Sequence, residues 1–169
     1  MKKGVIIQAS ARSNGNTSKI VRIIKSQTEF DIIDLNQKQI NHFDYEFNNK
    51  NDDFNLLFKE ITKNYDIILF ATPIYWYTMS GMLKVFLDRI SDFLFHEIEF
   101  GRLLKGKQMG IVSCGSDAEI FEGFEMPFVQ SANYLGMSYL GHLHTWVDNE
   151  DVSENVNNLI SEYVTRKIN

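Results

Sequence analysis

The sequence predicts a three-layer α/β sandwich, in which helices cover both faces of a five-stranded parallel sheet with strand order 2-1-3-4-5. Three observations carry this prediction. Strand-like and helix-like segments alternate along all 169 residues, and the unbroken apolar run at 67–71 is typical of a strand that is covered on both sides. No sequence repeat or low-complexity linker interrupts the alternation, so we expect a single domain spanning residues 1–169.

The expected elements follow from apolar runs and from helical spacing. The strands are predicted at 5–7, 30–35, 67–71, 109–112 and 138–147. Apolar residues at helical spacing predict helices around 20–24, 54–61, 81–94, 127–135 and 156–163. The polar stretch at 36–53 is the longest irregular region, and the segment 96–99 is expected to be solvated.

Composition and charge narrow the class of protein. The chain is 44% hydrophobic with a formal net charge of -5, and it lacks the basic patch that a nucleic-acid binder would show. Its single cysteine, Cys114, cannot form an intrachain disulfide or a thiolate metal site. The apolar run after the N-terminus is too short for a signal peptide or a membrane span. We therefore expect a cytoplasmic protein without nucleic-acid or membrane partners.

The expected strand order places a ligand at one edge of the sheet. The order reverses between the first and third strands, which leaves a crevice beyond their carboxyl ends. Three loops reach this crevice, at 10–18, 72–80 and 113–119. We expect these loops to carry the function.

The first loop is rich in hydroxyl and amide side chains and leads into a helix. Free backbone N–H groups in the first turn of that helix favour an anion such as phosphate. The side chains expected to hold it are those of Ser10, Arg12, Ser13, Asn16, Thr17 and Ser18. The same residue types also form ordinary turns and N-caps, so the loop alone leaves both interpretations open. The glycine patterns of a P-loop and of a dinucleotide-binding loop are missing.

The second loop carries three adjacent aromatic residues, Tyr75, Trp76 and Tyr77, directly after a buried strand. Large aromatic side chains need a partner, which can be the core, a second subunit or a flat ligand. An isoalloxazine ring suits such a wall, with Pro73 and Ile74 beside it. The backbone N–H groups of Tyr75 or Trp76 are expected to reach the polar edge of the ring. Packing as core or interface stays open as the alternative.

The third loop is built of small residues. Ser113, Gly115 and Ser116 would let the backbone approach a ligand closely, although an ordinary strand-to-helix turn explains the same residues. His142 and His144 share one face of the last strand at a spacing that could ligate a metal. No third ligand is apparent in the sequence, so we expect no metal site.

Together, the three loops resemble the NAD(P)H-dependent FMN reductase and flavodoxin-like oxidoreductase family. The resemblance covers essentially the whole chain and is strongest in SARSNGNT at 10–17 and in TPIYWYTMSG at 72–81, continuing to KVFLDR at 84–89. It implies a flavodoxin-like fold. It also implies that the FMN phosphate is held by Ser10, Arg12, Asn16, Thr17 and Ser18. The ring would then lie against Pro73, Ile74, Tyr75, Trp76 and Tyr77, with Ser113, Gly115 and Ser116 near its far edge.

The resemblance implies an enzyme that uses FMN to pass electrons from NAD(P)H to a small acceptor, such as a quinone, a flavin or a nitro compound. The flavin carries the chemistry in such an enzyme, so no catalytic side chain is expected. Relatives often form dimers, and Met82, Val85 and Phe93 are expected on the contact surface of a homodimer. Two alternatives stay open: a flavodoxin-type electron carrier, and a flavin-free binding protein of the same fold. The chain lacks the hydroxyl-rich loop of true flavodoxins and the cysteine cluster of iron–sulfur relatives.

Overall fold

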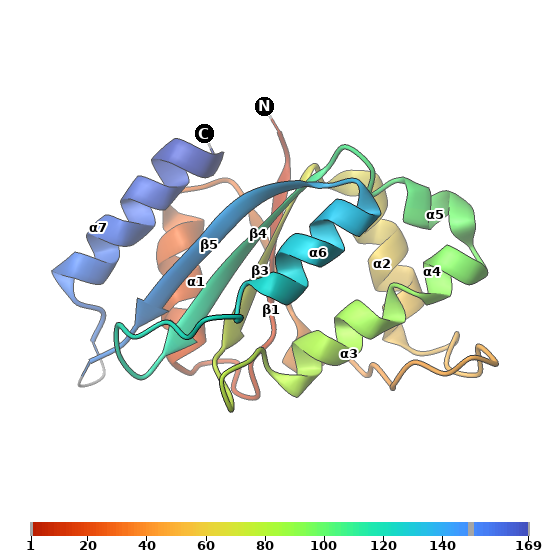
Figure 1. The fold of residues 1–169 in the computed structure, drawn as a ribbon, viewed down its shortest axis with the longest axis horizontal. Helices are drawn as coiled ribbons and strands as arrows, with labels where there is room; N and C mark the ends of the chain where they lie inside the picture. The colour runs from red at the N-terminus through yellow and green to blue at the C-terminus, as the bar shows by residue number, and fades with distance from the viewer. Residues whose placement is uncertain (1, 149–150, 169) are drawn as a thin grey trace.

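The computed structural model describes residues 2–148 and 151–168, and it folds them as one parallel sheet between two layers of helices (Figure 1). Five strands lie in the order β2-β1-β3-β4-β5, and every neighbouring pair is parallel. The predicted fold class and strand order are therefore confirmed. The strands are β1 (Gly4–Gln8), β2 (Asp31–Asp34), β3 (Ile67–Pro73), β4 (Gln108–Gly115) and β5 (Ser138–Trp146).

The helices divide between the two faces of the sheet (Figure 1). On one face lie α1 (Asn16–Ser26) and α7 (Glu154–Tyr163), which a short π-helical segment (Val164–Ile168) follows. The other face is covered by α2 (Asp53–Asn64), α3 (Gly81–Arg89), α4 (Asp92–Phe95), α5 (Ile98–Arg102) and α6 (Met126–Leu135). A single 3-10 turn (Leu35–Gln37) follows β2. Within residues 2–148 and 151–168, no helix is both long enough and apolar enough to cross a bilayer.

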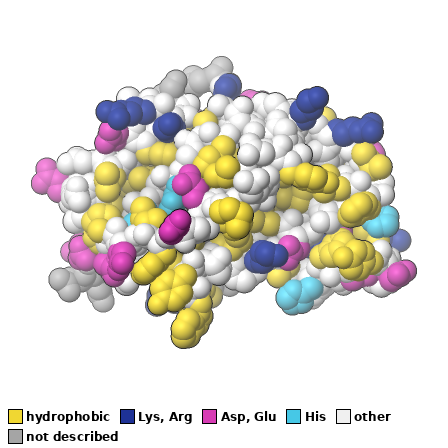
Figure 2. Space-filling view, viewed as in Figure 1, with side chains coloured by type: hydrophobic (Ala, Val, Ile, Leu, Met, Phe, Trp, Pro, Cys, Tyr) yellow, Lys and Arg dark blue, Asp and Glu magenta, His cyan; other side chains and the backbone are white. Residues whose placement is uncertain are grey.

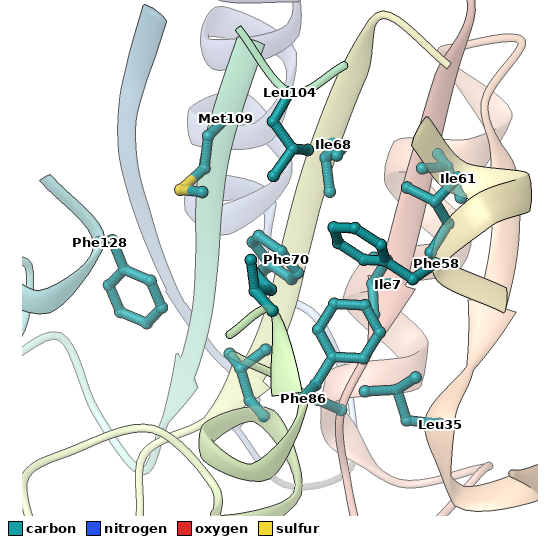
Figure 3. Close-up of a cluster of buried hydrophobic side chains, with 14 of the residues drawn as sticks. Ile7, Leu35, Phe58, Ile61, Ile68, Phe70, Phe86, Leu104, Met109 and Phe128 are labelled. Carbon is teal, nitrogen blue, oxygen red and sulfur yellow. The ribbon is translucent and has the colours of Figure 1, made fainter. Parts of the chain in front are cut away.

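Each face of the sheet has its own apolar core, because successive strand residues point to opposite faces. In β1, Ile7 belongs to the core under α2 and α3, whereas Ile6 packs against α1 and α7. The core under α2 and α3 is rich in phenylalanine, and Phe58, Phe70 and Phe86 lie together in it (Figure 3). Burying such large side chains supplies most of the free energy that holds helices to a sheet.

The region after α3 departs from the expected pattern. A single helix at 81–94 is predicted, but the chain tightens after Arg89, where the N–H of Ile90 donates to the carbonyl of Leu87. The resulting turn points Phe93 into the core, where its ring lies 4.5 Å from that of Phe58. The expectation that Phe93 lies on a contact surface is therefore wrong.

The segment 96–99 is largely exposed, as expected, but two of its side chains make specific contacts. The exposed ring of His96 stacks on Phe47 at 4.2 Å between ring centroids. The half-buried Glu97 forms an ion pair with Lys59 at 2.7 Å. These contacts join the start of α5 to segments that lie far away in the sequence.

A buried arginine holds the long irregular segment before α2. Arg89 is 1% exposed and pairs with Asp92 through Nε at 2.7 Å and with Asp52 through Nη1 at 2.5 Å. Its Nη1 and Nη2 groups also donate to the carbonyls of Asn41 and Asn49, at 3.0 and 3.2 Å. One guanidinium thus anchors three points of a segment that has little regular structure.

Replacing Arg89 by methionine should be strongly destabilising, because it leaves two buried carboxylates without their cation. We expect the free energy of unfolding to fall by about 3–5 kcal/mol. The control is Lys84→Met, which breaks the exposed pair between Lys84 and Asp88 and should cost less than about 1 kcal/mol. Urea unfolding of the two variants measures both values, and equal losses would contradict the anchoring role of Arg89.

Candidate functional site

The three loops expected to carry the function are tied together at the carboxyl edge of the sheet. The N–H of Ala9 donates to the carbonyl of Ala71 at 2.8 Å, and the hydroxyl of Ser80 donates to the carbonyl of Ala9 at 2.7 Å. The N–H of Ile74 donates to the carbonyl of Cys114 at 3.1 Å. The loops that follow β1, β3 and β4 therefore start from one shared framework.

The loop after β3 folds into a tight hairpin whose tip is strained. Tyr75 and Thr78 exchange two backbone hydrogen bonds, at 2.9 and 3.1 Å. The N–H of Tyr75 is therefore already bonded, and the expectation that it reaches the polar edge of a ring is wrong. Between them, Trp76 and Tyr77 adopt left-handed backbone conformations with φ of 49° and 65°. For a residue other than glycine, this backbone conformation costs on the order of 1 kcal/mol. The turn nevertheless presents two large rings to solvent, with exposed fractions of 91% and 62%.

A cavity of about 380 Å³ lies between this hairpin and the loop after β4. Figure 2 shows hydrophobic side chains projecting at the lower edge of the molecule, where the β3–α3 loop lies in the same view. The rings of Tyr77 and Phe121 meet edge to face across the cavity at 4.7 Å. The volume falls in the range of small-molecule sites. The lining residues are Ile74, Trp76, Tyr77, Gly115, Ser116, Asp117, Glu119 and Phe121.

The loop after β1 leads into an open helix N-terminus. Gly15 precedes α1 in an extended conformation, and in the described structure no side chain caps this helix and no acidic residue occupies its first turn. The buried hydroxyl of Ser18 accepts from Arg22 at 3.0 Å, and the hydroxyl of Ser13 accepts from the amide of Asn36 at 3.1 Å. The first turn can therefore offer its backbone N–H groups and helix dipole to an anion.

The residues predicted to bind the phosphate differ in how deeply they are buried. Ser10, Thr17 and Ser18 are buried at the end of β1 and the start of α1, whereas Arg12 and Asn16 are exposed. The hydroxyl of Ser10 accepts from the N–H of Arg12 at 3.5 Å. The buried side chains shape the loop, and the exposed ones remain accessible to a ligand.

Cys114 is buried near the carboxyl edge of the sheet, and its thiol is not activated as a nucleophile. Burial raises the pKa of its thiol to about 11, although the hydroxyls of Thr145 and Thr17 act in the opposite direction. A thiol with this pKa stays protonated near neutral pH, which fits a packing role and not that of a nucleophile.

Ser113 turns away from the cavity and lies between the two histidines of β5. Its hydroxyl oxygen is 2.7 Å from Nε2 of His142 and 2.8 Å from Nδ1 of His144. The other nitrogen of His144, Nε2, is 2.9 Å from the carbonyl oxygen of Asp117. Burial, and then the charge of His144, lowers the pKa of His142 to about 4. Within the described residues, no group of three or more metal-ligating side chains comes together.

The structure brings together most of the ring-contacting residues that the sequence predicts. Ile74, Trp76, Tyr77, Gly115 and Ser116 all line the cavity. Three predicted residues do not line it: Pro73 is buried at the end of β3, Tyr75 is exposed outside the lining, and the side chain of Ser113 faces the histidines. Sequence reasoning missed three lining residues: Asp117, Glu119 and Phe121. The aromatic Phe121 within a polar loop is the one local signal that could have marked this wall.

The doubly wound sheet, the open N-terminus of α1 and the aromatic-walled cavity define a flavodoxin-like α/β protein. Residues 2–151 match the profile of the NADPH-dependent FMN reductase family, and the chain belongs to this family. It is an oxidoreductase that uses FMN and a reduced nicotinamide nucleotide.

One curated relative agrees with this assignment, and two solved structures share the fold. The chain is 29% identical over 153 residues to YwqN of Bacillus subtilis (strain 168), which is named as an NAD(P)H-dependent FMN-containing oxidoreductase, and the match covers 83% of each chain. The solved Trp repressor binding protein from Bacillus subtilis superposes with a TM-score of 0.76 at 24% identity, covering 98% of this chain and 97% of the other. An FMN-dependent NADH-azoreductase from Bacillus anthracis str. Ames Ancestor, solved with FMN, has a TM-score of 0.72 at 13% identity over 100% of both chains.

The lowered pKa of His142 makes the stability of the fold depend on pH. The pKa is about 4 in the folded chain and about 6.5 in the unfolded chain. Between these values the unfolded chain binds more protons, so the free energy of unfolding should fall by up to about 3 kcal/mol as the pH drops through this window. Urea unfolding at several pH values measures the slope.

The matched control for this slope is His142→Gln. Glutamine keeps an N–H near the position of Nε2, beside the hydroxyl of Ser113, but it does not titrate. The pH dependence of the variant should be flatter between pH 4 and 6.5. A slope identical to that of the wild type would show that another group causes the pH dependence.

Proposed function

We propose that this oxidoreductase passes electrons from NAD(P)H to a small acceptor, such as a quinone, a free flavin or a nitro compound, with FMN held in the crevice at the carboxyl edge of the sheet. The observation that carries the proposal is the cavity of about 380 Å³ walled by a strained aromatic hairpin. Backbone strain of this kind persists where the surroundings impose it, and it clusters at functional sites. When bound, FMN supplies the hydride and electron chemistry.

The phosphate of FMN would lie at the N-terminus of α1. The backbone N–H groups of the first turn and the dipole of the 11-residue helix favour a dianion there. Asn16, the first residue of the helix, is exposed and offers an amide donor. Arg12 is exposed in the same loop and can add a charge-assisted contact.

The isoalloxazine ring would lie in the cavity between Trp76 and Tyr77 on one side and Gly115 on the other. The rings of the hairpin supply a flat apolar wall for a flat ligand. Gly115 packs closely against His144 behind this wall, because a Cβ there would lie 2.9 Å from Cε1 of His144. On the cavity side Gly115 presents no side chain, so its backbone can approach the ring.

The donor and the acceptor would use the same open space in turn. Trp76 is 91% exposed at the mouth of the cavity, so a nicotinamide can stack there and then leave before the acceptor enters. Trp76 and Tyr77 would shape this space by excluding water from one side of it. The exposed mouth favours small acceptors that enter the cavity.

A homodimer remains part of the proposal, on a different surface from the predicted one. With Phe93 buried, the accessible apolar groove lies between α3 and α6, where a hollow of about 320 Å³ is lined by Leu87, Leu94 and the 78% exposed Tyr134, among others. Exposed apolar grooves of this kind mark association surfaces in many proteins.

The absorbance spectrum of the purified protein tests the proposed function. After addition of FMN we expect the flavin bands to co-migrate with the protein and to bleach when NADH or NADPH is added anaerobically. A quinone should restore the bands. Protein that stays colourless with FMN would overturn the proposal, and a long-lived semiquinone during titration would favour a one-electron carrier instead. Sedimentation of the same sample reports the oligomeric state.

Asn16→Asp provides a sharper test of the phosphate position. A carboxylate at the start of α1 should stabilise the helix by about 0.3–1 kcal/mol while it repels the FMN phosphate. We expect the Kd for FMN to rise about tenfold, which corresponds to about 1.4 kcal/mol of repulsion. The Kd for riboflavin, which lacks the phosphate, should stay unchanged, and fluorescence titration measures both values.

The control for the phosphate position is Asn16→Ser, which removes the amide without adding charge. This variant should change the FMN affinity by less than about threefold, because serine adds no charge and its hydroxyl can still donate to a phosphate oxygen. If Asn16→Asp weakens FMN and riboflavin equally, the phosphate does not bind at this helix.

A further inference from the structure

The contacts around Ser113 form a hydrogen-bonded chain with a fixed direction. A carbonyl oxygen only accepts, so the 2.9 Å contact to Asp117 places a proton on Nε2 of His144. With that single proton on the ring, Nδ1 of His144 accepts from the hydroxyl of Ser113 at 2.8 Å. The hydroxyl oxygen in turn accepts from Nε2 of His142 at 2.7 Å. For a neutral His144, this is the one proton assignment that satisfies all three contacts.

His144 lies directly behind one wall of the cavity. Its side chain is buried, and a Cβ on Gly115 would lie 2.9 Å from its Cε1 and 3.4 Å from its Nε2. The imidazole therefore backs the segment 115–117, which lines the cavity on its other side. A shift of the ring would be transmitted to this wall, because no side chain separates them.

The bond from His144 fixes more than one residue of the wall. The carboxylate of Asp117 accepts from the N–H of Glu119 at 2.9 Å and from the hydroxyl of Ser116 at 3.0 Å. These bonds lower the pKa of Asp117 below its usual range, with the bond from Glu119 contributing most. Residues 116–119 thus form one hydrogen-bonded turn, and the carbonyl of Asp117 ties this turn to His144.

The loop that carries the wall is anchored at both ends by the same histidine pair. At its far end, the ring of Phe124 stacks on His142 at 5.1 Å. The residues between these anchors, 117–123, are all exposed. Phe121 reaches from this exposed stretch to Tyr77, on the opposite wall of the cavity. The position of the loop therefore depends on its two ends, where Asp117 contacts His144 and where Phe124 contacts His142 and Phe128.

We propose that His144 is a positioning residue for the flavin-binding cavity: its Nε2–H bond to the carbonyl of Asp117 holds the wall at 115–119 in place for the isoalloxazine ring. The contact between this wall and the flavin rests on the function proposed above, whereas the hydrogen bond between His144 and Asp117 does not. His144 acts through the backbone of Asp117.

Two amide substitutions separate the two bonds of His144. Glutamine in His144→Gln places an amide N–H near Nε2 and can keep the bond to Asp117. Asparagine in His144→Asn places an amide oxygen near Nδ1, where it keeps the contact to Ser113 but does not reach Asp117. Both variants lose the imidazole packing, so a difference between them reports the tie to the loop.

Hydrogen–deuterium exchange of peptides from 115–123, measured without FMN, is the first readout. We expect faster exchange in His144→Asn and near-wild-type exchange in His144→Gln. The second readout is the Kd for FMN by fluorescence quenching. We expect a rise of up to about tenfold in His144→Asn, which corresponds to the upper end of the value of one neutral hydrogen bond, and less than about threefold in His144→Gln.

The two readouts distinguish the possible failures. If both variants exchange like the wild type, or equally fast, the tie does not hold the loop and the inference fails. If exchange follows the expected order but the FMN affinity of both variants equals that of the wild type, the wall does not contact the flavin and the inference also fails. If the wild-type protein itself does not bind FMN, the proposed function fails, while the exchange result still decides whether His144 holds the loop.

Discussion

The reversal of strand order at β1 is the constraint on which the rest of the structure depends. β1 pairs with β2 on one side and with β3 on the other, so the connections that leave β1 and β3 pass to opposite faces of the sheet. The loops at their carboxyl ends must then part, and the cavity lies next to this point, between the loops after β3 and β4. The open end of α1, the aromatic hairpin and the cavity all lie along this edge.

The layers of the fold could be predicted because their signals are local. The run at 67–71 is apolar throughout, and the structure buries all of it at the centre of the sheet. The break after Arg89 could not be predicted in the same way. It depends on a guanidinium that meets Asp52 and carbonyls of the irregular segment before α2, about forty residues away in the sequence. A helical pattern carries no information about such a distant partner.

The site was predictable as a set of loops, but less so as a set of side chains. Topology alone brings 72–80 and 113–119 to the same edge, and the cavity lies there. The direction of Ser113 depends on register: it is paired with His144 in the sheet, so their side chains share one face. Without the register, a serine at the end of a strand is equally compatible with facing a ligand. Phe121 was missed because no periodicity governs a loop.

The two walls of the cavity are held by different physical means, and this difference would suit the proposed site, in which a donor and an acceptor enter in turn. The hairpin wall is a strained turn that leaves Trp76 91% exposed, so little packing fixes the position of this ring. The opposite wall is tied from behind by Asp117 to a buried histidine, so it keeps its place. A cofactor needs a fixed surface to hold its orientation between turnovers, whereas a donor and an acceptor of different shape need a yielding one. In the proposed site, the loop tied to β5 through His144 would orient the cofactor, and the exposed ring of Trp76 on the two-residue turn would adjust to the donor and the acceptor.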